Sequence, residues 1–243
     1  MRCLVTLVAV ALTGAGCISA PRVPDRAELI RGVLASTVQL RSERDGGFRR
    51  AASGVVVATD PGARRSWIVT ARHFVEPSHP QRIYVRLPGS TSVVPASVAF
   101  VSPDLDLAII ETEHLNVVPV RLKTVASLGD EILLVAFPWG ERFTVVRGVV
   151  SQIASSPGEL VVTGPARMVD ASVSYGSSGG GVFDTRTGEL VGIVESYRTV
   201  KVAIPEMKER ILEMPVAGET TLIPALSIFR FLADSGLSGF LPR

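Results

Sequence analysis

The sequence predicts an all-β protein. Between residues 36 and 195, short runs rich in valine, isoleucine and threonine alternate with glycine, proline, aspartate and serine. Runs of this kind at close spacing, with no helical stretch between them, favour an antiparallel sandwich or a pair of barrels. The chain has 243 residues, of which 47% are hydrophobic and 20% charged, so it can bury a sizeable core.

The first residues read as an export signal. Met1-Arg2 precedes an apolar run from Cys3 to Ala15. This run is too short to span a bilayer and is typical of the core of a signal peptide. We therefore expect residues 1–16 to be a signal peptide outside the fold, and the protein to be exported to the bacterial cell envelope.

A cysteine follows this run in a particular setting. Leu12-Thr13-Gly14-Ala15-Gly16-Cys17 resembles the lipobox of bacterial lipoproteins, with Gly14 where leucine is usual. We expect lipidation of Cys17, residues 17–26 as a tether, and a membrane-anchored protein facing the periplasm or the outside. Ordinary signal cleavage with an incidental Cys17 is the alternative. With Cys3 removed and Cys17 acylated, neither of the two cysteines is left for a disulfide.

The N-terminal part of the fold is predicted to begin with a helix over residues 26–34, with Asp25 at its cap. A strand over residues 36–41 and a loop over residues 43–51 follow. The other predicted strands cover residues 53–58, 66–70, 82–87, 92–100, 107–111, 131–136, 144–153, 159–163, 181–183 and 189–194.

The C-terminal part combines helix and strand signals. Residues 205–212 predict a short helix with proline at its first position. Residues 220–224 predict the last strand. Residues 225–234 predict a closing helix, whose inward side chains are expected to be Leu226, Phe229 and Leu232.

Charge gives little support to a nucleic-acid partner. The 25 basic and 23 acidic residues leave a formal net charge of +2, and no long basic run is present. No internal repeat of 20 to 50 residues is visible.

A candidate nucleophile lies in the stretch from Asp170 to Phe183. Within it, Gly176-Ser177-Ser178-Gly179-Gly180 places a hydroxyl between glycines that allow a sharp turn and close approach to a substrate. Only Ser178 fits the register Gly-x-Ser-Gly-Gly. The backbone N–H groups of Gly176 and Ser178 are candidates for an oxyanion hole. A flexible turn between two strands is the alternative interpretation of this pentapeptide.

A serine hydroxyl needs a base, and the chain has only three histidines. His73 follows an apolar run and is expected at the end of a buried strand, whereas His79 and His114 lie in segments that look like loops. The base in turn needs a carboxylate to orient it. Asp106 stands at the mouth of an apolar strand and is the preferred candidate; Asp104, after a proline, reads as a loop residue.

These residues occur in a recognisable order. Thr70 to His73, Asp106 to Ala108 and Gly176 to Gly180 together resemble the chymotrypsin-like serine proteases, and most closely their HtrA/Deg branch. Asp170-Ala171, eight residues before Ser178, fits that branch as well. Further matching landmarks are residues 136–140, 147–151 and 190–193, so the resemblance spans about residues 36–232.

The resemblance implies a protease domain over residues 27–243. It would consist of two six-stranded β-barrels, about 27–117 and 124–243, joined by a linker near 117–123, with the triad at their junction. It implies that Ser178 attacks, His73 acts as base and then acid, and Asp106 orients the ring. It also implies an oxyanion hole at Gly176, Ser177 and Ser178, a protein or peptide substrate, and no metal or organic cofactor.

Other expectations rest on the same resemblance. HtrA-like enzymes often continue into a PDZ domain, for which we expect no room in this chain. Glu195, Ser196 and Tyr197 would contact the substrate, and residues 197–219 would frame the specificity pocket. Glu195 stands where the family places a small or amide side chain near the catalytic aspartate, and we expect it to point outward as a rim residue.

Three smaller departures from the family pattern remove no catalytic group: Ser177 replaces asparagine, Arg72 a small or polar residue, and Gly181 a proline. The alternative function is a protease-fold binding protein of the envelope that has lost turnover. An esterase is a weaker alternative, because the elbow and alternating helices of α/β-hydrolases are absent.

Overall fold

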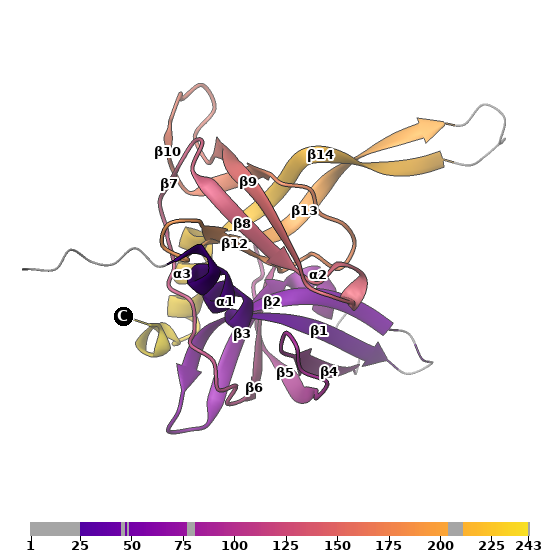
Figure 1. Ribbon diagram of the computed structural model, residues 1–243, viewed down its shortest axis with the longest axis vertical. Coiled ribbons are helices and arrows are strands. Elements are labelled where there is room, and N and C mark those ends of the chain that lie inside the picture. Colours follow the sequence, from indigo (N-terminus) through magenta and orange to yellow (C-terminus); the bar gives the residue numbers. More distant parts are fainter. Residues whose placement is uncertain (1–24, 45–46, 48, 77–80, 204–210, 243) are drawn as a thin grey trace, which may run out of the picture.

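The computed structural model describes residues 25–44, 47, 49–76, 81–203 and 211–242. Two β-barrels lie against each other, the first formed by the strands coloured purple and the second by those coloured pink to yellow (Figure 1). Both are closed and antiparallel, so the all-β, two-barrel prediction is confirmed. The predicted signal peptide, Cys17 and most of the tether lie outside the described residues.

The first barrel has the strand order β1-β2-β3-β6-β5-β4, and pairing of β4 with β1 closes it. Its interior is filled by branched aliphatic side chains, including the fully buried Val38, Val56, Ile68 and Ile110. Its strands are β1 (Thr37–Arg44), β2 (Arg49–Asp60), β3 (Arg65–Ala71), β4 (Gln81–Arg86), β5 (Val94–Val101) and β6 (Leu107–Glu113).

The second barrel has the order β11-β14-β13-β12-β8-β9, closed by pairing of β9 with β11. The short strands β7 (Ala126–Ser127) and β10 (Thr163–Gly164) pair beside it. Its own strands are β8 (Glu131–Ala136), β9 (Thr144–Ile153), β11 (Ala166–Asp170), β12 (Gly181–Asp184), β13 (Leu190–Ala203) and β14 (Ile211–Pro224).

Helices cover the contact between the barrels. Helix α1 (Arg26–Ser36) and helix α3 (Ala225–Asp234) contribute Leu29, Val33, Ile228 and Leu232 to one apolar cluster. The cluster also contains Val55 and other side chains of both barrels, so it joins the two halves of the molecule. Burying a side chain of this size contributes about 1.5–3 kcal/mol. The remaining helices are α2 (Arg72–Val75), η1 (Pro138–Gly140) and η2 (Ser238–Phe240). Within the described part of the chain, no helix has the length and apolarity needed to cross a bilayer.

Several local predictions are wrong. The loop expected over residues 43–51 is largely strand, because β1 and β2 pair as far as Glu43 and Arg49. Residues 159–163 form no strand apart from Thr163 in β10, and β7 and β11 were not predicted. Asp25 stands at the N-cap of α1, but its side chain makes no capping hydrogen bond.

The C-terminal predictions also need correction. The helix predicted over residues 205–212 lies mostly outside the described residues, and its last two residues belong to β14. In α3, Leu232 is buried as expected, but Leu226 is only half-buried and Phe229 is 42% exposed. Ile228 points inward instead, one residue before Phe229 on the helix.

A partly buried ion-pair network ties the connection between the barrels to the second barrel. The Nζ of Lys123 lies 2.8 Å from Asp130 Oδ2 and also binds Asp184, whose side chain is 2% exposed. Asp184 Oδ1 accepts hydrogen bonds from the N–H groups of Arg186 and Thr187. Burial opposes the ionised form of Asp184, but the hydrogen bonds from Lys123 and these N–H groups outweigh it and lower its pKa.

Lys123→Met is therefore expected to lower the free energy of unfolding by about 3–5 kcal/mol, because it leaves a buried carboxylate without its cation. Urea denaturation at pH 7 measures the change. The control is Arg147→Met, which breaks a pair with Glu131 whose side chains are 53% and 54% exposed. We expect it to cost about 1 kcal/mol or less, and an equal loss in both variants would contradict the assignment.

The pH dependence of this difference follows from the pKa shifts. The pKa of Asp184 is lowered from 3.8, so its contribution is present above that pH and is lost as the pH falls through the lower folded value. Burial lowers the pKa of Lys123, but its hydrogen bonds to Asp130 and Asp184 raise it above 10.5 overall, so its contribution is lost only at higher pH. The difference between wild type and Lys123→Met should thus be constant from about pH 5 to about pH 9.

Candidate active site

The predicted base and acid are brought together by the pairing of β3 with β6. In that pair Ala71 lies opposite Leu107, so His73 at the start of α2 and Asp106 before β6 follow neighbouring strand ends. His73 Nδ1 lies 2.6 Å from Asp106 Oδ2, and the His73 N–H donates to Asp106 Oδ1 at 2.8 Å. Both carboxylate oxygens therefore fix the histidine, which leaves its Nε2 on the side away from Asp106.

The competing residues do not form such a pair. Asp104 is exposed and makes no hydrogen bond or ion pair to any described residue. His79 lies outside the described residues. His114 follows β6, and its buried Nδ1 finds no partner in the described part of the chain. Of the two leucines that flank Asp106, Leu107 is buried and Leu105 is 37% exposed.

Ser178 shares a cavity with His73. The cavity has a volume of about 570 Å³ and also borders Tyr175, Gly176 and Arg50. Ser178 itself lies on the connection between β11 and β12, whereas His73 belongs to the first barrel. The cavity therefore brings residues of both barrels together.

Residues 171–180, between β11 and β12, form the loop that carries Ser178, called here the serine loop. Its backbone is held in a defined orientation. The N–H of Trp139 donates to the carbonyl of Tyr175 at 2.7 Å, and because a trans peptide is planar, the N–H of Gly176 is turned away from Trp139. The N–H groups of Gly176 and Ser178 donate to no other group of the described residues. The Ser177 side chain is buried beneath the loop, and its Oγ accepts from the N–H of Ser174. The loop thus presents two unused donors, as an oxyanion hole requires.

Trp139 shows how the loop is supported from the first barrel. It has a φ of 57°, a left-handed conformation that is rare for a large side chain. The next carbonyl, of Gly140, accepts hydrogen bonds from the side chains of Gln39 and Arg41 on β1. The Trp139 ring lies 5.3 Å from that of Tyr175 between centroids.

Ser53 is a residue that the sequence reasoning missed. It is fully buried on β2, and its Oγ donates to the Gly176 carbonyl at 2.9 Å and accepts from the Phe137 N–H at 2.8 Å. Its own N–H donates to the Ser178 carbonyl at 2.9 Å. One residue of the first barrel, through its side chain and its backbone N–H, therefore holds the carbonyls of Gly176 and Ser178. In the sequence, Ser53 stands two residues before a run of valines, and nothing at that position indicates a role at the site.

The predicted substrate-contacting residues also lie at this cavity. Glu195, Ser196, Tyr197 and Thr199 of β13 line it together with His73 and Ser178. Glu195 is half-buried and falls at a register shift between the pairs of Val194 and Ser196 with β14. Among the described residues, no group of three or more His, Cys, Asp or Glu side chains is placed to hold a metal ion.

The sequence of this region matches a known family. Residues 52–193, which include His73, Asp106 and Ser178, match the family model of the trypsin-like peptidase domain. The chain belongs to this family. Its curated relatives include named proteases. The chain spans less than half the length of each of the three described below.

Three such relatives illustrate the relationship of this trypsin-like peptidase domain. A serine protease DegP homolog of Plasmodium falciparum is 30% identical over 142 residues, which cover 54% of this chain and 15% of the relative. A probable periplasmic serine endoprotease, DegP-like, of Pseudomonas putida strain GB-1 is 28% identical over 63% of this chain and 30% of its own length. The serine endoprotease DegS of Escherichia coli K12 is 29% identical over 60% of this chain and 39% of its own length.

Solved structures support the fold of the domain. The inactive form of the Rv3671c protease superposes with a TM-score of 0.61 at 22% identity, covering 86% of this chain and 92% of that one. A serine endoprotease from Yersinia pestis gives a TM-score of 0.64 at 20% identity, over 91% of this chain and 70% of that one.

Gly179 is expected to tolerate no side chain. It has a φ of +79°, and an added Cβ would lie 2.2 Å from the Ser53 carbonyl oxygen and 2.4 Å from Thr70 Oγ1. Gly89 has a similar φ of +74° but open space around it, so it serves as a matched control. Gly89→Ala should cost about 1 kcal/mol from backbone strain alone. Gly179→Ala should cost at least about 3 kcal/mol in urea denaturation, and equal losses would show that the close packing is not limiting.

Proposed function

We propose that this protein is a serine endopeptidase that hydrolyses peptide bonds through an acyl-enzyme, with Ser178, His73 and Asp106 as its catalytic residues. The observation that carries the proposal is the His73–Asp106 pair at 2.6 Å beside a cavity that Ser178 also lines. The named serine endoproteases among the relatives support the same reaction class.

Each residue has a defined part in this reaction. Ser178 Oγ attacks the scissile carbonyl carbon while His73 Nε2 takes the hydroxyl proton, and Asp106 stabilises the imidazolium that forms. The carbonyl oxygen becomes an oxyanion, which the N–H groups of Gly176 and Ser178 meet, with Ser177 as the residue between them. The imidazolium then gives its proton to the leaving amine. Water, deprotonated by the same histidine, releases the acyl group and restores Ser178. The proposal needs no metal or organic cofactor.

Covalent labelling by a fluorophosphonate probe tests the nucleophile without a known substrate. We expect the wild type to be labelled at Ser178, and the Ser178→Ala variant, which should keep the same unfolding temperature, not to be labelled. A folded wild-type protein that resists the probe would instead favour the alternative, a protease-fold binding protein without turnover.

The choice of carboxylate is tested by a matched pair of variants. Asp106→Asn is expected to lower kcat by about 10⁴-fold, because the amide cannot hold the same histidine tautomer or stabilise its charge. Asp104→Asn removes a charge of the same loop without touching His73 and should leave kcat within about twofold. The measurement is cleavage of a fluorescently labelled unfolded protein. The reverse ranking would assign the role to Asp104.

Glu195 is proposed to set side-chain preference. It lines the cavity beside Ser196 and Tyr197, where its carboxylate can attract a cationic substrate side chain. We expect Glu195→Gln to reduce kcat/KM at least about fivefold for substrates with lysine or arginine next to the scissile bond. Neutral substrates should change little. A uniform decrease would indicate a general structural effect instead.

The location is proposed to be the bacterial cell envelope, as for the periplasmic relative. Residues 17–26 would tether the domain to a membrane through lipid on Cys17, since a multiply acylated cysteine anchors stably. Mass spectrometry of the mature N-terminus should find Cys17 as its first residue with acyl chains attached. A mature chain that starts elsewhere, or an unmodified Cys17, would exclude the anchor.

A further inference from the structure

The cavity of Ser178 is lined by two strands from different barrels. Residues 195–197 and Thr199 belong to β13 of the second barrel, and residues 50–52 belong to β2 of the first. A polypeptide that crosses the cavity past Ser178 therefore has one part beside β13 and another beside β2. The β13 side carries the negative charge of Glu195, whereas the surface that continues outward from β2 is rich in arginine.

This surface is the outer side of β1, β2 and β4. Residues that pair directly across neighbouring strands point to the same side of a sheet, as do residues two positions apart along a strand. Glu43 of β1 pairs with Arg49 of β2 and with Arg82 of β4, and both arginines are exposed. The arginine face, named after its commonest residue, consists of Arg41, Arg49, Arg82 and Arg86, with Glu43, Ala51 and Tyr84 among them.

Positive charge predominates on the arginine face. Glu43 is its one carboxylate among the described residues, and it pairs with both Arg49, at 3.3 Å, and Arg82, at 3.9 Å. The side chains of these two arginines are 78% and 75% exposed. Arg41 and Arg86 donate to backbone carbonyls, which carry no net charge. Four guanidinium groups thus face a single carboxylate.

The charged groups around the arginine face do not cancel this excess. Glu76 lies 3.2 Å from Arg72, with which it forms its own ion pair. Glu141 is followed by Arg142, and both are exposed. Arg50 adds a cation at the cavity itself, where it donates to the His73 carbonyl at 2.8 Å. The excess of positive charge therefore extends to the cavity.

The arginine face is continuous with the candidate site. Arg41 donates to the carbonyl of Gly140 in η1, and Arg86 donates to the carbonyl of Glu141. A Cβ added to Gly140 would lie 2.4 Å from the Cβ of Ala51, so η1 packs directly on a residue that also lines the cavity. A substrate chain that leaves the cavity beside Ala51 therefore reaches the arginine face next.

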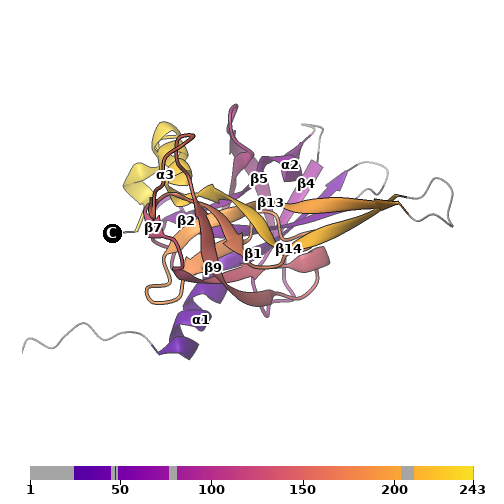
Figure 2. The same cartoon turned by 90° about the horizontal axis from the view of Figure 1, so that it is seen from above.

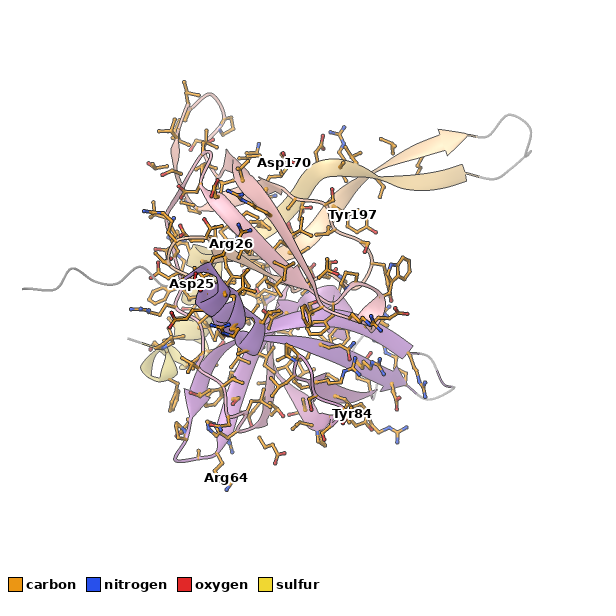
Figure 3. All side chains as sticks on the ribbon, in the orientation of Figure 1. Asp25, Arg26, Arg64, Tyr84, Asp170 and Tyr197 are labelled. Carbon is orange, nitrogen blue, oxygen red and sulfur yellow. The ribbon has the colours of Figure 1, made fainter. Side chains whose placement is uncertain are left out.

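The arrangement of the strands leaves this path accessible. In Figures 1 and 2, the end of β1 and the outer ends of β13 and β14 lie on the same side of the molecule, whereas α3 lies on the other. Tyr84, labelled in Figure 3, marks the arginine face on β4. One chain can therefore contact the cavity and the arginine face together.

We propose that the arginine face binds an acidic segment of the polypeptide substrate, so that the substrate class is a chain with clustered Asp or Glu on one side of the cleaved bond. The inference rests on the proposed function and deepens it. Guanidinium groups bind carboxylates through paired, charge-assisted hydrogen bonds. Because Arg49 lies two residues from Ala51, about 7 Å along β2, the acidic residues should begin about three residues from the cleaved bond.

Three peptides on the unaltered protein test the charge preference. Each is built around one β-casein cleavage site. Positions three to six from the bond carry glutamate on the N-terminal side in the first peptide, glutamate on the C-terminal side in the second, and glutamine on both sides in the third. We expect one glutamate peptide to exceed the glutamine peptide at least about tenfold in kcat/KM, because only one side of the chain lies beside β2.

The other glutamate peptide should not exceed the glutamine peptide. The acceleration should also fall between about 0.05 and about 0.5 M NaCl, because salt screens exposed charges. Equal rates for the three peptides would overturn the proposal, as would equal acceleration by both glutamate peptides.

A pair of variants assigns the preference to the arginine face. In Arg49→Gln/Arg82→Gln, the ratio of kcat/KM between the faster glutamate peptide and the glutamine peptide should fall to within about twofold of one. The control, Arg31→Gln/Arg230→Gln, removes the same charge from exposed positions on α1 and α3 and should keep the tenfold ratio. An unchanged ratio in the first variant, or an equal fall in the control, would contradict the assignment.

Binding without turnover makes the test independent of catalysis. The probe is the faster glutamate peptide or, if neither is cleaved, a fluorescein-labelled octaglutamate, and the protein is the full chain carrying Ser178→Ala. We expect Arg49→Gln/Arg82→Gln to raise Kd at least about fivefold by fluorescence anisotropy, and the control variant to change it less than about twofold. A thymidine oligonucleotide of equal charge that binds as tightly would refute the assignment to an acidic polypeptide.

The outcomes separate the two proposals. Cleavage and fluorophosphonate labelling without a charge preference refute the acidic site and leave the peptidase assignment intact. Absence of cleavage and of labelling refutes the peptidase assignment. In that case, arginine-dependent binding of octaglutamate supports the acidic site, and arginine-independent binding or no binding refutes it.

Discussion

The serine loop of the second barrel depends on one buried serine of the first barrel. Ser53 of β2 uses its side chain and its backbone N–H to hold the carbonyls of Gly176 and Ser178, while Thr70 Oγ1 donates to the Ser53 carbonyl. Gly179 lies so close to Ser53 and Thr70 that only a glycine fits. The serine loop is therefore shaped by the first barrel, and its geometry exists only when the two barrels are packed together.

Much of the fold could be predicted from local pattern. The bounds of β8, β9 and α3 agree with the predicted ranges, because turn-forming residues lie close to the ends of each segment. The pairing of the outer halves of β13 and β14 could not be predicted in this way. Residues 205–212 combine proline with alternating charges, a helical pattern, whereas Ile211 and Leu212 pair with β13. Pairing across the chain outweighs local propensity there.

At the site, too, some residues could be predicted from the sequence and others could not. His73, Asp106 and Ser178 stand beside strand ends or glycines, so their roles could be predicted from the sequence. Ser53 and Gln39 act only through contacts with distant backbone groups, and their neighbours in the sequence give no hint of those partners. Phe229 shows a smaller failure, since the apolar face of a helix is broad and its centre was placed one residue away, at Phe229 instead of Ile228.

The two tryptophans give the protein two optical reporters in opposite environments. Trp67 is 5% exposed in the first barrel, where its Nε1 donates to Glu111, and Trp139 is 65% exposed beside the serine loop. Indole emission shifts to longer wavelength in water, so the long-wavelength part of the fluorescence comes from Trp139 and the short-wavelength part from Trp67. Movement of the serine loop and opening of the barrel can therefore be observed separately in the unlabelled protein.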